Sequence, residues 1–433
     1  MKTEKTTQRR DFIKNTILGT LLPGVFTSII SFPEFAKAST DGLLPAAFKD
    51  NKALKISSVK LYKIKVNHRG SWYFIELFTN KGIVGIGECS HGVTGLKDGD
   101  DQLVEKEVAA IYKLIEGESP YAVEQFRQRS IGILSSKLSK TVFSGMEQAL
   151  WDINGKAAGI PSYIFFGGKL RNQLDVYANI NRAVKEKDSN GRRLASAFQK
   201  QAELAVSNGF RAIKMAPFDE MRPLTESTSQ EIQDDIAHGT NCIDEVRKVI
   251  GKDIQLLVDV HIHLNQQLSV EVAKQLEEMN LYWYEEPVDP NKFHEETLAI
   301  KKAIKQPLAG GEAIYGREGF AELIQSNALD ILMPDVKHCG GLLELKYISA
   351  MGETFHQLKV APHNPSGPVA TIATKTVCAG MPNFLIMEYA FGEVAWSKDL
   401  ISPNEIFVNG KISISDAPGH GYVLNKKVLN EHL

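Results

Sequence analysis

Residues 254–312 decide the fold, and three short apolar runs stand out within them: IQLLVDVH (254–261), LYWYEEP (281–287) and PLAGGE (307–312). Each run is rich in residues that favour β-strands, and each closes on a carboxylate, at Asp259, Glu285 and Glu312. These carboxylates are 26 and 27 residues apart, a length that fits one strand, one helix and two short loops. The stretch therefore predicts repeated strand–helix units.

The same spacing continues toward the C-terminus. Apolar runs end near Asp335, His363 and Glu388, at intervals of 23, 28 and 25 residues. In a (β/α)8 barrel the carboxyl ends of all strands meet at one mouth, where active sites lie. Converging carboxylates repel one another unless a cation lies between them, and all-oxygen ligands suit Mg²⁺. One acidic strand end is usually a helix cap, whereas three at this period favour a metal site.

Four motifs follow one another on successive predicted strands: YEEP (284–287), GGE (310–312), PDVKHCGG (334–341) and APHNPSGPVA (361–370). Together they resemble the enolase superfamily in its mandelate-racemase-like branch, and most closely the galactonate-dehydratase-like sugar-acid dehydratases. The resemblance extends from about Leu54 to the C-terminus. It implies an α/β fold with a modified (β/α)8 (TIM) barrel, an N-terminal α+β capping domain, Mg²⁺ and a Lys or His base.

Composition sets the class and the N-terminus suggests export. The 433 residues are 43% hydrophobic and 24% charged, with a net charge of −2, which argues against a nucleic-acid partner. Arg9-Arg10, an apolar run over 17–32 and Ala36-Lys37-Ala38 resemble a cleaved twin-arginine signal over residues 1–38, so we expect a periplasmic enzyme. An uncleaved membrane anchor is the alternative, although the run is short and contains Pro23. After residue 40 no run is long enough to span a membrane, and the four cysteines fit no zinc template.

Patterning divides the mature chain into a cap and a barrel. Residues 54–90 predict a three-stranded meander and 101–160 predict helices, so 54–165 form an α+β cap and 170–390 the barrel. Strand one ends near Asn179 and Asn181, a helix is expected over 192–207, and strand two ends at Lys214. The resemblance implies that residues 391–433 return to the cap, and that loops 68–72 and 90–96 read the substrate. His68, Trp72 and Asn181 are therefore candidate substrate contacts, with plain surface loops as the alternative for the cap.

The metal ligands and the base are assigned as follows. Asp259, Glu285 and Glu312 are the expected Mg²⁺ ligands; the family pattern uses the first acid of YEEP, so Glu286 is left as a cap or supporting contact. His363 and Asp335 end adjacent strands, and a carboxylate beside an imidazole orients it and raises its pKa. His363 is therefore the expected base.

The opposite face of the mouth decides between reactions. Family racemases carry Lys-x-Lys on strand two, whereas this chain has Lys214-Met215-Ala216, which counts against a two-base racemase. Lys214 is expected to hold the substrate carboxylate or stabilise charge. His261, two residues after Asp259, stands where the family's dehydratases have the acid that protonates the departing hydroxyl. Glu388 resembles the family acid that binds the substrate carboxylate.

These residues predict a Mg²⁺-dependent sugar-acid dehydratase that yields a 2-keto-3-deoxy acid. A cycloisomerase or epimerase is the alternative within the same chemistry, and a non-catalytic periplasmic sugar-acid binder is the alternative from another class. The expected partner is a small sugar acid, with no nucleic acid and no membrane in the mature form. The resemblance implies a homo-oligomer.

Overall fold

The structure is a computed structural model that describes residues 54–67, 70–92, 100–405 and 407–433. The expected signal segment 1–38, His68 and most of loop 90–96 lie outside these residues. The described part belongs to one compact unit that continues to Leu433.

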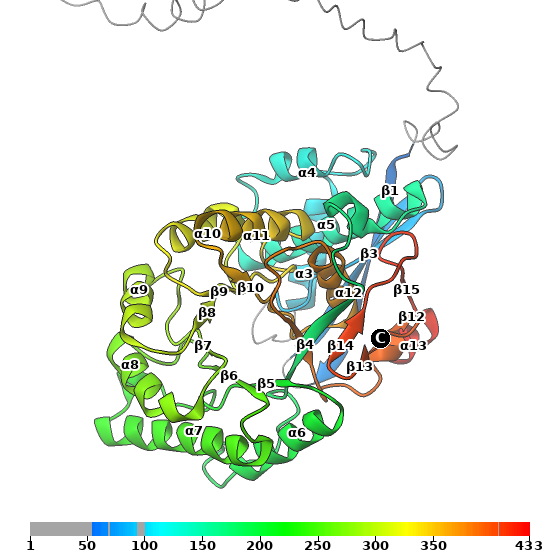
Figure 1. The fold of residues 1–433 in the computed structure, drawn as a ribbon. Coiled ribbons are helices and arrows are strands. Elements are labelled where there is room, and N and C mark those ends of the chain that lie inside the picture. Colours follow the sequence, from blue (N-terminus) through cyan, green and yellow to red (C-terminus); the bar gives the residue numbers. More distant parts are fainter. Residues whose placement is uncertain (1–53, 68–69, 93–99, 406) are drawn as a thin grey trace, which may run out of the picture. The chain divides into compact units, whose positions relative to one another are not determined.

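The cap is the predicted antiparallel meander covered by helices (Figure 1). Its longest helix, α5, starts at Ser136, whose side chain forms a reciprocal capping box with Ser139. The helix packs directly on the last strand, because a Cβ at Gly87 would lie only 1.9 Å from the carbonyl oxygen of Gly145. Glycine is therefore required for this close approach. The cap elements are β1 (Ile56–Asn67), β2 (Gly70–Thr79), β3 (Val84–Glu88), α3 (Asp100–Tyr112), α4 (Val123–Ser130), α5 (Lys137–Ala158) and the 3₁₀ turn η3 (Ser162–Phe166).

Eight parallel strands form the barrel, and helices surround them (Figure 1). The first seven strands pair with their neighbours in chain order, and the last strand pairs with the first. The seventh and eighth strands are joined just before the eighth begins, where Leu385 N–H donates to Val360 O at 2.8 Å. The strands are β4 (Gln173–Asn179), β5 (Ala212–Met215), β6 (Gln255–Asp259), β7 (Trp283–Glu285), β8 (Leu308–Gly310), β9 (Ile331–Leu332), β10 (Lys359–Val360) and β11 (Met387–Ala390). The connecting helices are α6 (Ala195–Ser207), α7 (Ser229–Ile250), α8 (Gln266–Gln275), α9 (His294–Ala303), α10 (Gly316–Gln325), α11 (Leu342–His356) and α12 (Pro368–Cys378), with the short turns η4 (Leu224–Glu226) and η5 (Glu277–Met279).

The barrel interior is packed and is not a pore. Buried side chains from all eight strand segments meet inside it, as expected when layers of inward-facing residues fill a barrel. This cluster comprises Tyr177, Ala212, Leu257, Trp283, Ala309, Ile331, Met333, Ala361 and Ile386.

The expected helix over 192–207 begins three residues later, at Ala195. Before it the chain folds back on itself, with an isolated bridge between Lys187 and Arg193. This correction matters because Arg193 belongs to the connection after β4, and its side chain is buried beside the functional site.

The C-terminal segment returns to the cap, as the resemblance implied. Ser162 N–H donates to Gly419 O at 2.7 Å, and His420 N–H donates to Asp152 Oδ1 at 2.7 Å. Strand β14 also pairs antiparallel with β4. The segment contains η6 (Ser397–Leu400), β12 (Ile401–Ser402), β13 (Phe407–Val408), β14 (Lys411–Ser413), β15 (Val423–Leu424) and α13 (Lys426–Glu431).

Two buried cap carboxylates hold the cap against helices that follow site strands. Glu147 of α5 accepts the N–H groups of Leu342 at 2.7 Å and Leu343 at 3.1 Å, at the start of α11. Glu88 of β3 accepts those of Gly367 at 2.9 Å and Ala370 at 2.8 Å, at the start of α12. Because the first N–H groups of a helix have no partner within it, each carboxylate caps a helix of the barrel.

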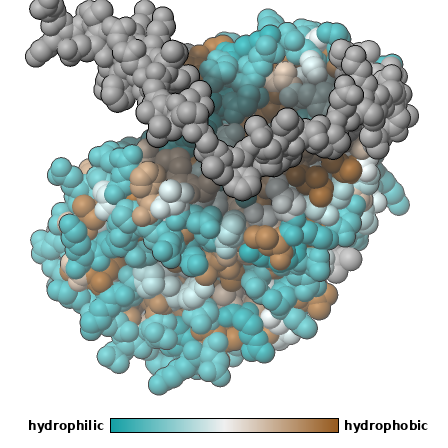
Figure 2. Space-filling view, turned by 45° about the horizontal axis from the view of Figure 1, so that its top comes forward, coloured by the Kyte–Doolittle hydropathy of each residue, from teal (hydrophilic) through white to brown (hydrophobic). Residues whose placement is uncertain are grey.

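Hydrophilic residues cover most of the face drawn in Figure 2, with hydrophobic residues in small separate groups. Among the described residues, no helix is long and apolar enough to cross a membrane.

Candidate active site

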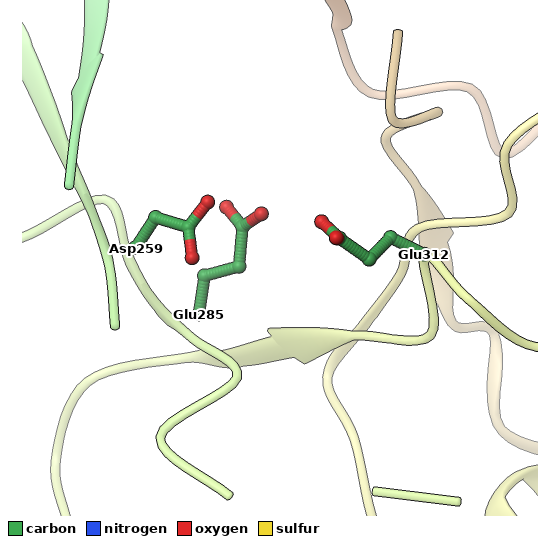
Figure 3. A group of neighbouring side chains, drawn as sticks. All are labelled: Asp259, Glu285 and Glu312. Carbon is green, nitrogen blue, oxygen red and sulfur yellow. The ribbon is translucent and has the colours of Figure 1, made fainter. Parts of the chain in front are cut away.

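The three predicted carboxylates converge. Asp259 and Glu285 end β6 and β7, Glu312 lies two residues beyond β8, and one oxygen from each lies within 4.8 Å of the others (Figure 3). Asp259 Oδ2 and Glu312 Oε2 are buried and accept no hydrogen bond from the part of the chain that the structure describes, although nitrogen atoms of His261 and His363 come within 3.1 and 3.0 Å of them. Those approaches lack hydrogen-bond geometry. Three converging carboxylates, two of them with a buried oxygen that accepts no hydrogen bond from the described residues, fit a small cation with oxygen ligands.

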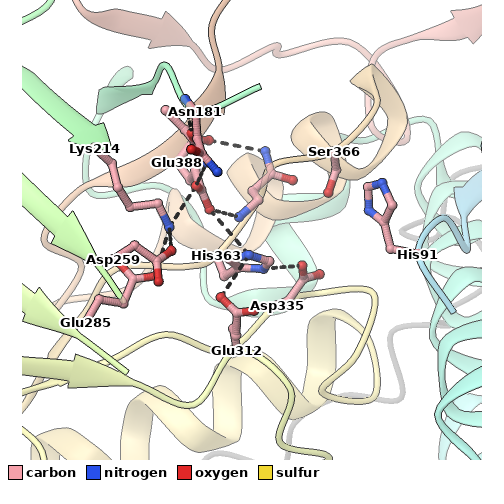
Figure 4. Close-up of polar contacts among 12 residues, drawn as sticks. His91, Asn181, Lys214, Asp259, Glu285, Glu312, Asp335, His363, Ser366 and Glu388 are labelled. Atoms are coloured by element: carbon pink, nitrogen blue, oxygen red, sulfur yellow. Dashed lines mark hydrogen bonds and ion pairs between the residues drawn. The ribbon is translucent and has the colours of Figure 1, made fainter. Parts of the chain in front are cut away.

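Lys214 is buried among the carboxylates, at 2% exposure. Its Nζ lies 2.8 Å from Glu285 Oε1, 2.9 Å from Glu388 Oε1 and 3.2 Å from Asp259 Oδ2 (Figure 4). Burial alone would lower the pKa of Lys214, but Glu285 and Glu388 hold it well above its usual range. Burial and the charge of Asp259 raise the pKa of Glu285. The site thus concentrates more negative charge than one ammonium offsets.

The predicted base and its partner are in contact. His363 Nδ1 lies 2.8 Å from Asp335 Oδ2, so the other ring nitrogen, Nε2, faces Glu312 and Glu388 (Figure 4). The buried Lys337 Nζ lies 2.5 Å from Asp335 Oδ2 and also contacts Ser366. Burial would raise the pKa of Asp335, but the charge of Lys337 outweighs it and holds that pKa well below the usual range. Asp335 is therefore a fixed negative charge behind the imidazole.

His261 lies on the other side of the triad. Its Nε2 is 3.1 Å from Asp259 Oδ2, and its Nδ1 is in hydrogen-bond contact with Asp219 Oδ1. Burial would lower the pKa of His261, but Asp259 and Asp219 raise it well above its usual range. The backbone of His261 is left-handed, with φ 48°, an uncommon conformation for a residue with a side chain.

Glu388 lies between Lys214 and His363. Lys214 contacts its Oε1, while Oε2 accepts Asn364 N–H at 2.8 Å and lies 3.8 Å from His363 Nε2. Asn179, at the end of β4, also donates to Oε1 at 2.7 Å. Asn181, two residues further along the chain, has a different partner: its side-chain amide donates to Asp219 at 3.0 Å.

Glu286 has the supporting position expected for the second acid of YEEP. Its Oε1 accepts the N–H groups of Gly311 at 2.7 Å and Glu312 at 3.2 Å. These bonds fix the turn that carries the third carboxylate. Burial and the charge of Glu312 raise the pKa of Glu286 to about 8.

Trp72 differs from its predicted surroundings. It lies within β2 and not in a loop, it is 2% exposed, and it packs on Phe74 and Trp396. Its indole N–H is buried without a hydrogen-bond partner among the described residues, beside a cavity that Ser366 also lines. His68 lies outside the described residues, so both substrate-contact assignments stay predictions.

Sequence reasoning missed several residues that complete the site. Asp219 and Arg193 lie in connections after β5 and β4 and come from no strand end, so the spacing that found the triad gave no signal for them. Lys337 lies inside the PDVKHCGG motif, two residues after Asp335, so its position in the motif was a signal for a contact with Asp335. His91 and Arg182 also approach each other from the cap and from the β4 connection, at 3.3 Å.

The fold and site define a capped (β/α)8-barrel enzyme with a carboxylate triad and acid–base side chains on both sides of it. The model of the family "Enolase C-terminal domain-like" matches residues 197–428, and that of "Mandelate racemase / muconate lactonizing enzyme, N-terminal domain" matches residues 55–167. The chain belongs to the enolase superfamily and has both domains of its mandelate racemase/muconate lactonizing enzyme branch.

Curated relatives are named as sugar-acid dehydratases. The chain is 27% identical to the D-xylonate dehydratase of Haloferax volcanii, over 84% of this chain and 85% of that protein. It is 28% identical to the D-galactonate dehydratase of Variovorax paradoxus, over 78% of this chain and 82% of that protein.

Solved structures agree on the architecture. The mandelate racemase/muconate lactonizing enzyme from Sulfitobacter sp. matches with a TM-score of 0.78 and 25% identity, over 88% of this chain and 95% of that one. A member of the enolase superfamily from Salmonella Typhimurium matches with a TM-score of 0.76 and 24% identity, over 88% and 98% of the two chains, and supports the fold alone.

Proposed function

We propose that this protein is a Mg²⁺-dependent dehydratase that converts a sugar acid into a 2-keto-3-deoxy acid. The observation that carries the proposal is the pair of histidines, His363 and His261, each in contact with its own carboxylate, on the two sides of the triad. β-Elimination needs a base for the α-proton and an acid for the departing hydroxyl. The relatives named as dehydratases are hydro-lyases, and this chain is an enzyme of the same class.

His363 is the base. Its Nε2 removes the proton from the carbon next to the substrate carboxylate, and the C–H electron pair moves into an enediolate. Asp335 keeps Nδ1 hydrogen-bonded, so the imidazolium that forms is stabilised where it stands. When bound, Mg²⁺ supplies charge neutralisation for the substrate carboxylate as it becomes dianionic. Asp259, Glu285 and Glu312 are the residues that would hold the ion.

His261 is the acid. As the enediolate collapses, its electron pair forms the C2–C3 double bond, the C3–O bond breaks, and the Nε2 proton of His261 leaves with the hydroxyl as water. The resulting enol takes a proton at C3 and becomes the 2-keto-3-deoxy acid. Lys214 and Glu388 are the buried ion pair that would position the substrate carboxylate. The absence of a second lysine, at Ala216, argues against reprotonation from the opposite face and hence against a racemase.

A substrate screen and an isotope-exchange assay test the proposal together. With Mg²⁺ present, gluconate, galactonate, xylonate and the corresponding diacids are assayed for 2-keto-3-deoxy acids. In D₂O, His363→Asn should stop both dehydration and exchange of the α-proton, because no base remains. His261→Asn should stop dehydration but retain exchange, since the enediolate still forms and returns.

General acid–base assistance is worth about 10²- to 10⁴-fold, so each loss is measurable. His263→Asn, two residues along the same loop, is the matched control and should leave both rates within about 3-fold. Formation of an isomer with no keto acid, or binding of the acids with no turnover, would refute the dehydratase assignment. Dehydration at near wild-type rate in His261→Asn would remove His261 from the acid role.

A further inference from the structure

A second histidine–carboxylate pair is built from residues far apart in the sequence. Asp219 lies in the connection between β5 and α7, and its carboxylate is mostly buried, at 16% exposure. One oxygen, Oδ1, contacts His261 Nδ1, and the other, Oδ2, lies 3.0 Å from Asn181 Nδ2 and 3.1 Å from Arg193 Nη2. The two oxygens therefore have different partners: Oδ1 contacts the imidazole, whereas Oδ2 contacts the amide of Asn181 and the guanidinium of Arg193.

Arg193 holds this carboxylate from behind. Its side chain is 2% exposed and donates to Ala216 O at 2.6 Å, to Asn181 O at 3.1 Å and to Glu220 Oε1 at 2.6 Å. Because these acceptors hold the rigid guanidinium fork on several sides, it cannot turn to suit a new side chain. The orientation of Asp219 is thus set by the protein before any substrate binds.

The backbone at His261 also leaves the ring dependent on this contact. His261 and Ile262 both have left-handed backbones, with φ 48° and 57°, and Ile262 N–H donates to Glu286 O at 2.7 Å. The loop is fixed, but the imidazole can still rotate about its own χ2 bond. The contact to Asp219 Oδ1 selects the ring orientation in which a hydrogen on Nδ1 points to Asp219 and Nε2 faces the triad.

We propose that Asp219 is a positioning residue for His261, and that this pair controls elimination of the hydroxyl while the His363–Asp335 pair controls removal of the proton. The inference rests on the proposed dehydration. Asp219 contacts no reacting atom; it acts by fixing the tautomer and the orientation of the acid.

Asp219→Asn gives the sharpest test, because Arg193 and Asn181 both donate toward the Oδ2 position. The amide oxygen must therefore turn toward them, which leaves the NH₂ group facing His261 Nδ1. Nδ1 then has to accept a hydrogen bond, which leaves the ring neutral with its only hydrogen on Nε2. Such a ring cannot act as the acid, because loss of that proton would leave an imidazolate. Asp219→Asn should be as damaging as Asp219→Ala, although it is nearly isosteric.

In both variants we expect dehydration to fall about 10²-fold, the size of effect that misplacing a catalytic group produces. KM should change less than about 3-fold, and α-proton exchange in D₂O should persist. Asp234→Asn is the matched control: it makes the same change at an exposed carboxylate of α7, which accepts from Gln230, and it should retain dehydration.

The tautomer provides a readout that does not depend on turnover. In ¹⁵N-histidine-labelled, Mg²⁺-loaded protein, the His261 ring signals are identified by their loss in His261→Asn. We expect Nδ1 of His261 to carry a hydrogen in the wild type and to carry none in Asp219→Asn.

Near wild-type dehydration by Asp219→Asn, or equal loss of dehydration and exchange, would overturn the inference, as would an unchanged ring tautomer. If the wild type forms no keto acid from any sugar acid, the proposed function fails; the positioning contact then stands or falls on the ring signals alone.

Discussion

Lys214→Met is expected to destabilise the metal-free protein strongly and the Mg²⁺-bound protein much less. The ammonium contacts Glu285, Glu388 and Asp259 at 2.8 to 3.2 Å and is almost completely buried. Methionine has nearly the same length and fills the same space, so the change removes charge without creating a large cavity. What remains is a cluster of buried carboxylates that has lost its buried ammonium.

The size of the effect follows from the loss of one partner in a buried ion pair, which costs about 3–5 kcal/mol. The unfolding entropy of a domain of about 390 residues is about 0.8 kcal/mol per degree. The EDTA-treated variant should therefore melt about 4–6 °C below the wild type. Saturating Mg²⁺ supplies a cation to the same carboxylates, so we expect it to reduce the difference by at least half.

The assay is thermal unfolding, followed by circular dichroism, of wild type and variant in EDTA and in Mg²⁺. Lys248→Met is the control, because that lysine is 58% exposed and its ion pairs lie on the surface of α7; it should shift the midpoint by less than about 1 °C. Equal midpoints of Lys214→Met and wild type in EDTA would refute the argument that the triad depends on a cation. An equally large deficit in Mg²⁺ would show that lysine and metal do not neutralise the same charges.

Three further predictions address metal, pH and export. Asp259→Asn and Glu312→Gln should abolish turnover and the rise in melting temperature that Mg²⁺ produces in the wild type; full wild-type activity after EDTA treatment would exclude the metal role. Burial holds the pKa of His338 in the folded protein well below 6.5. Below pH 6.5 the unfolded chain therefore binds a proton that the folded protein does not, and the free energy of unfolding falls by at most about 1.4 kcal/mol per pH unit. His338→Gln should reduce this slope in urea titrations. Protein from native cells should begin near Ser39 and lie outside the inner membrane, and an N-terminal sequence starting at Met1 would contradict the export signal.

The strand-end residues were predictable because a (β/α)8 barrel converts sequence period into spatial convergence. Asp259, Glu285 and Glu312 come together although each is separated from the next by a whole helix. The pairing of His363 with Asp335 followed from the same rule, since adjacent parallel strands end at the same level. Local chemistry also located the meander and the C-terminus of α6, where glycine ends the helical pattern.

The rest was not accessible because it depends on contacts between connections. Asp219 lies in the long segment after β5, which has no period, and only the folded chain brings it to His261. The α6 boundary was misplaced because Arg193 suits a helix by propensity but is held outside it by buried acceptors. Trp72 was assigned to loop 68–72, whereas the pairing of β1 with β2 reaches Gly70, so Trp72 belongs to the strand.

The two histidine–carboxylate pairs share a charge arrangement that explains how they operate beside the same triad. Lys337 contacts Asp335, and Arg193 contacts Asp219, so each carboxylate has a buried cation beside it in addition to its histidine. Without those cations, two more negative charges would add to the crowded triad, and both carboxylates would tend to take up protons. With them, each carboxylate stays ionised and still orients its imidazole. In the proposed dehydration, one histidine would take a proton from the substrate and the other would give one to the hydroxyl, so the total charge around the triad would stay nearly constant.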